Sequence, residues 1–180
     1  LVEVTGENRI LLHHGLKAIS KNARPGIRAL LQVVRCSPDY LTVRDIISRI
    51  SPRINAAGRM SLATEAVDLL TEKSDARATE LAGNLDRLNQ VRRSYDEQIT
   101  RDAIAQLSER EEFKHVNIVW GKGWHRGVIG IVATRLIEHR YRPSIVISDD
   151  NGVMVGSARS TPGLDIHELI KDCGEYLEQF

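Results

Sequence analysis

A stretch of 38 residues, 75–112, contains no proline and only one glycine. Within it Leu81, Leu85 and Leu88 recur at three- and four-residue steps, which is the period of one face of an α-helix. Such a helix is about 55 Å long at 1.5 Å per residue, and few globular helices reach that length. A helix of this kind bridges two lobes or packs in a coiled coil. Because the apolar stripe is thin and Arg92 interrupts it, we favour a bridge.

The residues before this helix carry an excess of positive charge. Residues 1–60 contain 10 Lys and Arg against 4 Asp and Glu, and eight of those cations are Arg. Residues 61–112 reverse the balance, with 7 against 12, and residues 113–180 contain 8 of each sign. Arginine suits forked contacts with phosphate, so a phosphate-facing surface is one interpretation of the basic third. A solvated surface is the other.

Composition excludes several classes of protein. Charged residues make up 27% and hydrophobic residues 42%, as in globular proteins and unlike disordered ones. No apolar run approaches the roughly 18 residues of a membrane span, so no membrane partner is expected. The cysteines, Cys36 and Cys173, are too few and too far apart for a disulfide framework, and a cytoplasmic location is expected. Because the chain begins with Leu1 in a predicted strand, we expect a piece of a longer protein.

Local patterns before the long helix predict mainly helical structure. Residues 51–60 are the exception and are predicted to be an ordered loop, because Pro52 and Gly58 interrupt a segment with little apolar period. Thr42 is predicted to cap a short helix, with Asp45 three residues on as an acidic capping-box partner. The remaining expectations are a strand over 1–4 and helices over 9–20, 25–34 and 61–71, with Ile46, Ile47 and Ile50 facing inward.

After the long helix the pattern becomes α/β. A strand over 115–120, a helix over 126–140 and a strand over 144–148 predict a parallel pair with a right-handed crossover. A hairpin turn at 149–152 returns the chain antiparallel over 153–157, so the fold class is α/β with a mixed sheet in the last third. Asp165 is predicted to cap a last helix. The buried face expected for that helix comprises Ile166, Leu169, Ile170, Cys173 and Leu177.

The first candidate site is the glycine-rich segment Gly121–Gly130. It follows a strand and opens a helix, whose free amides and dipole favour an anion. Lys122, His125 and Arg126 add positive charge, and Trp124 offers a face on which a base could stack. The spacing matches neither Gly-x-Gly-x-x-Gly nor the P-loop. The alternative is a tight turn between strand and helix that uses glycines for packing and half-buries the tryptophan.

The second candidate lies at the end of the last strand. Ser157 and Ser160 flank Arg159, and all three can donate to phosphate oxygens. The alternative is a polar exit from a strand.

The third candidate is the segment with Arg53, Asn55 and Arg59, where two arginines among small residues suit a backbone phosphate. The alternative is a packing loop whose arginines cap carbonyl groups.

No metal site is expected from these residues. His13 and His14 are adjacent, so on a helix they point about 100° apart, and a surface-and-core pair explains them. Cys36 and Cys173 fit small apolar fillers better than nucleophiles.

The segments 52–60, 123–133 and 156–160 together resemble the RecJ single-strand DNA exonucleases of the DHH phosphoesterase superfamily. The order and spacing of the three motifs match over nearly the whole chain. The resemblance implies that residues 1–60 are the end of the DHH catalytic domain with an interdomain loop. It also implies that 61–112 are a helical connector and 113–180 a truncated DHHA1 substrate-binding domain.

The resemblance also implies an activity and a set of roles. The family hydrolyses single-stranded DNA from the 5′ end, in repair and recombination, with Mn²⁺ or Mg²⁺ held by Asp and His residues that would precede Leu1. The chain alone is therefore expected to be inactive. Its DNA-binding residues would be Arg53, Asn55, Arg59, Lys122, Trp124, Ser157, Arg159 and Ser160, with His125 and Arg126 supporting charge at the scissile phosphate.

Two other functions stay open at this point. One is a different DHH-family phosphoesterase that acts on short oligonucleotides or nucleotides. The other is a nucleic-acid-binding module without catalysis. An Asp-His-His sequence upstream of Leu1 would favour an enzyme over a module.

Overall fold

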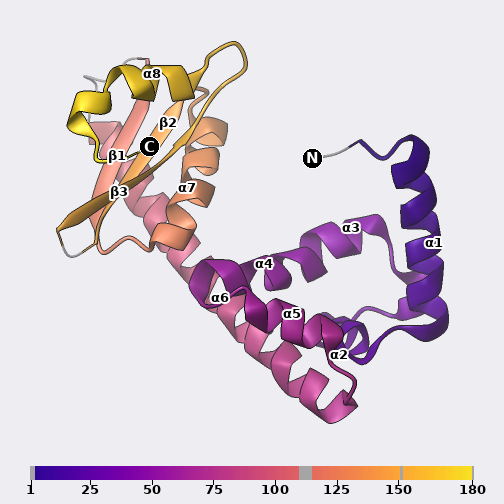
Figure 1. Ribbon diagram of the computed structural model, residues 1–180. Coiled ribbons are helices and arrows are strands. Elements are labelled where there is room, and N and C mark those ends of the chain that lie inside the picture. Colours follow the sequence, from indigo (N-terminus) through magenta and orange to yellow (C-terminus); the bar gives the residue numbers. More distant parts are fainter. Residues whose placement is uncertain (1–2, 110–114, 151, 180) are drawn as a thin grey trace. The chain divides into compact units, whose positions relative to one another are not determined.

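The computed structural model describes residues 3–109, 115–150 and 152–179. The chain divides into two compact units, Leu1–Arg92 and Arg93–Phe180, which we call the first and second units (Figure 1). The long helix α6, Asp75–Glu109, belongs to both. The prediction of an uninterrupted helix is therefore confirmed as far as Glu109, and its expected last three residues lie outside the described part of the chain.

The first unit is helical, as predicted. Thr42 and Asp45 form a complete capping box, in which the Thr42 hydroxyl accepts from the Asp45 amide and the Asp45 carboxylate accepts from the Thr42 amide. Ile50 is buried after this cap, but Ile47 is 56% exposed, so its predicted inward orientation was wrong. The helices are α1 (Gly6–Asn22), α2 (Pro25–Val33), α3 (Val43–Asp45), continued by a π-helical turn over Ile46–Ile50, α4 (Ser51–Met60) and α5 (Thr64–Thr71), with a 3₁₀ turn at Pro38–Tyr40.

Helix α4 corrects the expectation of a loop over residues 51–60. Proline inside a helical run lacks the N–H of one helical hydrogen bond, and here a π-helical turn over Ile46–Ile50 directly precedes the turn that contains Pro52. Ala56 and Ala57 are completely buried, so this helix packs through small side chains that leave no long apolar stripe in the sequence. The strand expected at 1–4 is also wrong where it can be described, because Glu3 and Val4 are exposed and not in a strand.

Leucines of α2, α5 and α6 make the core of the first unit. Leu30, Leu69 and Leu85 have no exposed surface. Helices α2 and α5 approach so closely that a Cβ at Gly26 would lie 2.0 Å from the Leu69 carbonyl oxygen. Arg28 of α2 also pairs with Asp75 at the start of α6, at 2.6 Å. These contacts hold the beginning of α6 against α2 and α5.

The second unit contains the mixed sheet that the sequence predicted. Strand β1 (Asn117–Lys122) is parallel to β2 (Ser144–Asp150), and β2 is antiparallel to β3 (Val153–Arg159), in the order β1-β2-β3. Helix α7 (Arg126–His139) makes the crossover between β1 and β2, and α8 (Ile166–Asp172) follows β3 (Figure 1). The fold class is confirmed, and β3 extends two residues beyond the predicted end to include Arg159.

The core of this unit lies between the sheet, α7 and the end of α6. Val119, Val132 and Val146 are completely buried, and Ala103 of α6 joins them. The side chain of buried Asn117 donates to the Arg140 carbonyl at 2.9 Å and to the Ser144 hydroxyl at 3.0 Å. Asp96 of α6, 1% exposed, pairs with Arg135 of α7 at 2.8 Å. Helix α6 is therefore part of the second unit from Arg93 onward.

Helix α8 has the predicted cap but not the predicted burial. The Asp165 carboxylate accepts from the His167 and Glu168 amides. Leu169 is 49% exposed and Leu177 40% exposed, and Cys173 is exposed too. An amphipathic pattern predicts which face is apolar but not which part of a chain covers it. No helix among the described residues is long and apolar enough to cross a bilayer.

Candidate nucleic-acid interface

Arg159 and Ser157 of β3 face Gly130 of α7. The Arg159 guanidinium donates to the Ser157 hydroxyl at 3.1 Å and to the Ala158 carbonyl at 2.7 Å. A Cβ at position 130 would lie 2.8 Å from Arg159 Nη2 and 3.0 Å from Ser157 Oγ. Gly130 thus makes room for the arginine beside the helix. Arg159 is exposed and pairs with no acidic side chain in the described part of the chain, so it can still bind an anion.

His125 caps the helix that begins beside this arginine. Its ring nitrogen Nδ1 accepts from the Gly127 amide at 3.1 Å, and its carbonyl oxygen accepts from Val128 at 2.8 Å and Ile129 at 3.3 Å. The Gly127 and Val128 amides belong to the first turn, whose free amides the sequence offered to an anion. Both of these amides already have His125 as a partner within the protein. Because Nδ1 is an acceptor, the neutral ring carries its proton on Nε2.

Trp124 packs inside the second unit. Its side chain is only 8% exposed, and a Cβ at Gly121 would lie 2.1 Å from the indole ring. The Ser148 hydroxyl donates to the Trp124 carbonyl. Gly123, with φ of +70°, takes a conformation that favours glycine. The loop therefore matches the alternative of a tight packed turn, and the indole has no open face for a base.

Tyr95 is a neighbour of this loop that the sequence did not indicate. Its ring lies 5.4 Å from the His125 ring, centre to centre, with the two planes 39° apart. It is 39% exposed. In the sequence it is one member of the apolar stripe of α6, and no local signal connects it with a loop thirty residues later.

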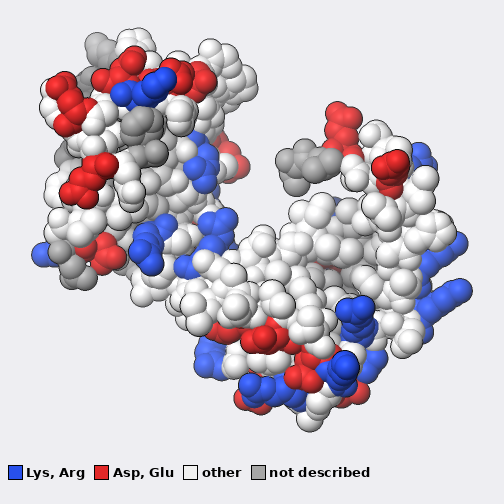
Figure 2. Space-filling model, in the orientation of Figure 1, with Lys and Arg blue, Asp and Glu red and all other residues white. Residues whose placement is uncertain are grey.

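The other predicted contacts in this unit are exposed to different degrees. Lys122 and Arg126 are exposed, and their side chains make no hydrogen bond or ion pair with the described residues. Ser160 is exposed, but its hydroxyl donates to the Thr161 and Leu164 carbonyls. Figure 2 shows Lys and Arg side chains over the region of α7, and Asp and Glu side chains around α5 in the first unit.

The arginines of α4, in the first unit, have different surroundings. Arg53 pairs with Asp86 of α6 at 2.7 Å and donates to the Arg49 carbonyl at 2.6 Å. Its side chain is only 19% exposed, so the packing interpretation fits this arginine better than a phosphate contact. Asn55 and Arg59 are both exposed. They are four residues apart and so share one face of α4.

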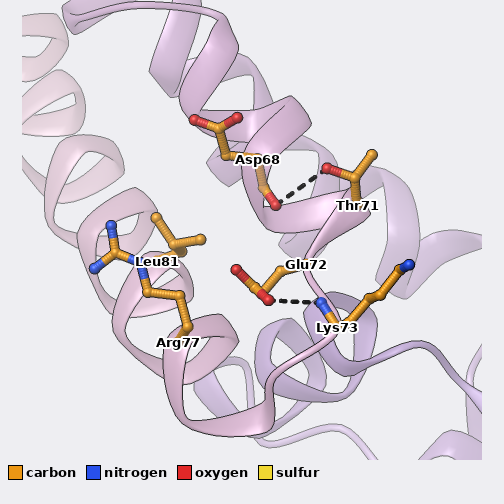
Figure 3. Close-up of a pocket in the computed structure, with 6 residues that line it drawn as sticks. All are labelled: Asp68, Thr71, Glu72, Lys73, Arg77 and Leu81. Carbon is orange, nitrogen blue, oxygen red and sulfur yellow. Dashed lines mark hydrogen bonds between the residues drawn. The ribbon is translucent and has the colours of Figure 1, made fainter.

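An open hollow lies elsewhere in the first unit, between α5 and the start of α6 (Figure 3). It is open, has a volume of about 430 Å³ and contains none of the predicted site residues. The Ser74 and Lys73 amides donate to Glu72 and lower the pKa of its carboxyl group. Arg77 is paired with Glu80 at 2.6 Å. Glu72 and Arg77 are therefore engaged in local structure. The hollow is lined by Asp68, Thr71, Glu72, Lys73, Arg77 and Leu81.

A divalent metal does not fit the described residues. No group of three or more His, Cys, Asp and Glu side chains among them is arranged to hold one. The rings of His13 and His14 meet edge to face, with planes 80° apart, so they do not aim at a common point.

Comparison with known proteins supplies the class. Residues 94–177 match the DHHA1 domain family, and this range covers most of the second unit. The chain is also 32% identical over its whole length to the single-stranded-DNA-specific exonuclease RecJ of Bacillus subtilis, of which it covers 23%. The chain is 34% identical to the single-stranded-DNA-specific exonuclease RecJ of Haemophilus influenzae, in an alignment that covers 95% of this chain and 31% of that protein.

Solved structures agree with this assignment. The Mg²⁺ complex of RecJ from Thermus thermophilus matches with a TM-score of 0.87 and 29% identity over 99% of this chain and 27% of that one. A manganese-bound RecJ exonuclease matches with a TM-score of 0.80 and 30% identity over 93% of this chain and 41% of that one. The chain is thus similar to RecJ exonucleases over nearly its whole length, as its motifs predicted, and spans about a quarter to a third of the curated relatives it matches.

Proposed function

We propose that this chain is part of a 5′-to-3′ single-stranded-DNA exonuclease and that it supplies contacts to the strand. The curated relatives are named as single-stranded-DNA-specific exonucleases, and this supports phosphodiester hydrolysis as the activity of the whole protein. RecJ structures solved with Mg²⁺ and Mn²⁺ support a divalent metal in the whole enzyme. We assign the residues of this chain to binding and orienting the strand.

The observation that carries the proposal is the position of Arg159 beside Gly130. A guanidinium with no acidic partner among the described residues, next to the Ser157 hydroxyl, offers several donors to one phosphate group. Charge-assisted hydrogen bonds of this kind are stronger than neutral ones. A glycine within α7 makes the approach possible. Phosphate contacts of this sort fix the register of a strand without reading its sequence.

The other predicted residues take secondary roles in this proposal. Asn55 and Arg59 give the first unit an exposed polar face for a backbone phosphate. Lys122 and Arg126 add positive charge near the strand. The Nε2–H of His125 is a donor for the scissile phosphate, with its orientation fixed by the cap at Nδ1.

The whole protein would then be arranged in three parts. Residues 1–60 would end the DHH catalytic domain, 61–112 would connect, and 113–180 would bind substrate. The free cysteines Cys36 and Cys173 support a reducing cytoplasm, where repair and recombination of DNA take place.

The test is the affinity of the chain for a 5′-phosphorylated oligothymidylate, measured by fluorescence anisotropy at several salt concentrations. Arg159→Ala should weaken binding about tenfold, since bonds to charged groups contribute roughly 1.5–3 kcal/mol. It should also reduce the salt dependence by about one phosphate contact. Arg140→Ala, at the far end of α7, is the control and should bind like the wild type. If the Arg159 variant binds with the same affinity as the wild type, Arg159 does not contact the strand, and the alternative of a polar strand end is supported.

A further inference from the structure

Burial of Trp124 removes the aromatic face that the sequence offered to a base. A nucleic-acid site that holds only phosphates leaves the bases of a single strand exposed to water. Single-strand binding proteins usually add aromatic side chains on which bases stack. The described surroundings of His125 contain one such side chain, and it comes from α6.

Tyr95 has the properties that stacking needs. It is 39% exposed, whereas Trp124 is 8% exposed. Its ring is tilted by 39° from the His125 ring, so the contact does not cover a whole face of the tyrosine as parallel stacking would. The hydroxyl makes no hydrogen bond with another described residue, so the ring is not needed to satisfy a buried polar group.

His125 gives this ring a fixed neighbour. The imidazole is tied to α7 through the hydrogen bond from the Gly127 amide to Nδ1. Tyr95 is held on α6, which is anchored to α7 nearby by the pair between Asp96 and Arg135. Two rings from different helices are thus fixed side by side next to exposed Arg126. Cations beside an aromatic face are the usual surroundings of a stacked base.

We propose that Tyr95 is the side chain on which a base of the single strand stacks, beside the phosphate contacts at His125 and Arg126. This rests on the proposed function and adds a recognition element that contacts bases. Stacking is tolerant of base identity because every base has a π-face. The contact would favour strands with unpaired bases over duplexes, whose bases already stack on one another.

The experiment compares two probes of equal length, an oligothymidylate and a phosphodiester chain of abasic sites, with wild type, Tyr95→Ala, Tyr95→Leu and Tyr95→Phe. Tyr95→Ala and Tyr95→Leu should each lose about five- to tenfold in affinity for the oligothymidylate and nothing for the abasic chain, as expected for one stacked base. Tyr95→Phe should bind both probes like the wild type. Tyr141→Ala is the control, since Tyr141 is 71% exposed and follows the opposite end of α7.

Equal losses on both probes would overturn the proposal, because Tyr95 would then act only by holding His125. No loss on either probe, with Arg159→Ala still weakening binding, would overturn it and leave the proposed function standing. If the wild-type chain binds neither probe, the proposed function fails, and the stacking role fails with it.

Discussion

Among single residues, Gly130 lowers the stability of helix α7 but leaves room for the Arg159 side chain beside it. Glycine inside a helix costs roughly 0.5–1 kcal/mol relative to alanine. The sequence places Gly130 in a glycine-rich segment that suggests a close approach to a ligand. The structure shows that the close neighbours are Arg159 and Ser157, whose positions in the sequence are almost thirty residues away.

Gly130→Ala should therefore separate stability from binding. The new methyl group would displace the end of the flexible Arg159 side chain and require a small shift of the Ser157 hydroxyl, so urea unfolding should show nearly unchanged stability, while affinity for oligothymidylate falls severalfold. Gly83→Ala is the matched control, because a Cβ there meets nothing within 4 Å, and it should stabilise α6 without changing affinity. Unchanged binding by the Gly130 variant would show that the position of Arg159 is unimportant.

Residue types were predictable at the candidate site, but their partners were not. The sequence identified Arg53 and Trp124 as candidates from their immediate surroundings. Arg53 is paired with Asp86, thirty-three positions later, and Trp124 is covered by the fold. Tyr95 was missed for the same reason, since only the packing of α6 against α7 brings it to His125.

Among the elements, α4 shows where periodicity fails as a guide. Helices with large apolar side chains were predicted well: α2 has nearly the predicted ends, and α6 begins where predicted. Helix α4 buries Ala56 and Ala57, and alanine contributes little to an apolar stripe although it is the best helix former. Pro52 suggested a break, but the backbone stays helical through it, directly after a π-helical turn over Ile46–Ile50. Caps were more reliable, since Thr42 and Asp165 cap the predicted helices.

The cap of α3 makes the stability of the first unit depend on pH. Two hydrogen bonds lower the pKa of the Asp45 carboxyl group from its ordinary value of 3.8. The larger effect comes from the Thr42 hydroxyl and the next from the Thr42 amide. A carboxyl group whose pKa is lower in the folded state stabilises the fold above the unfolded value and ceases to do so as pH falls through the folded one. Asp45→Asn should therefore be less stable than the wild type at neutral pH.

This difference should shrink as the pH falls below about 3.8, because the protonated aspartic acid resembles the amide. Urea unfolding at a series of pH values measures it, and Thr42→Val should move the pKa of Asp45 back toward 3.8 in an NMR titration. A difference between wild type and Asp45→Asn that stays constant with pH would contradict a role for the charged carboxylate.

At the scale of the whole molecule, the chain has two cores and one shared helix. Leu69 belongs to the core of the first unit and Leu136 to that of the second, and neither has exposed surface. Both tryptophans, Trp120 and Trp124, lie in the second unit, so tryptophan fluorescence reports on that unit alone. Far-UV circular dichroism is dominated by helices, most of which lie in the first unit.

The two cores should therefore respond separately to mutation. If one core unfolds, the half of α6 that packed against it is only marginally stable as an isolated helix. The shared helix therefore transmits little stability from one unit to the other. Leu69→Ala should lower the stability followed by circular dichroism by about 2–5 kcal/mol and leave the fluorescence transition in place, and Leu136→Ala should shift the fluorescence transition instead. If either substitution shifts both transitions equally, α6 couples the cores into one cooperative unit. Substitutions in the first unit would then also change the stability of the second unit, which contains Arg159.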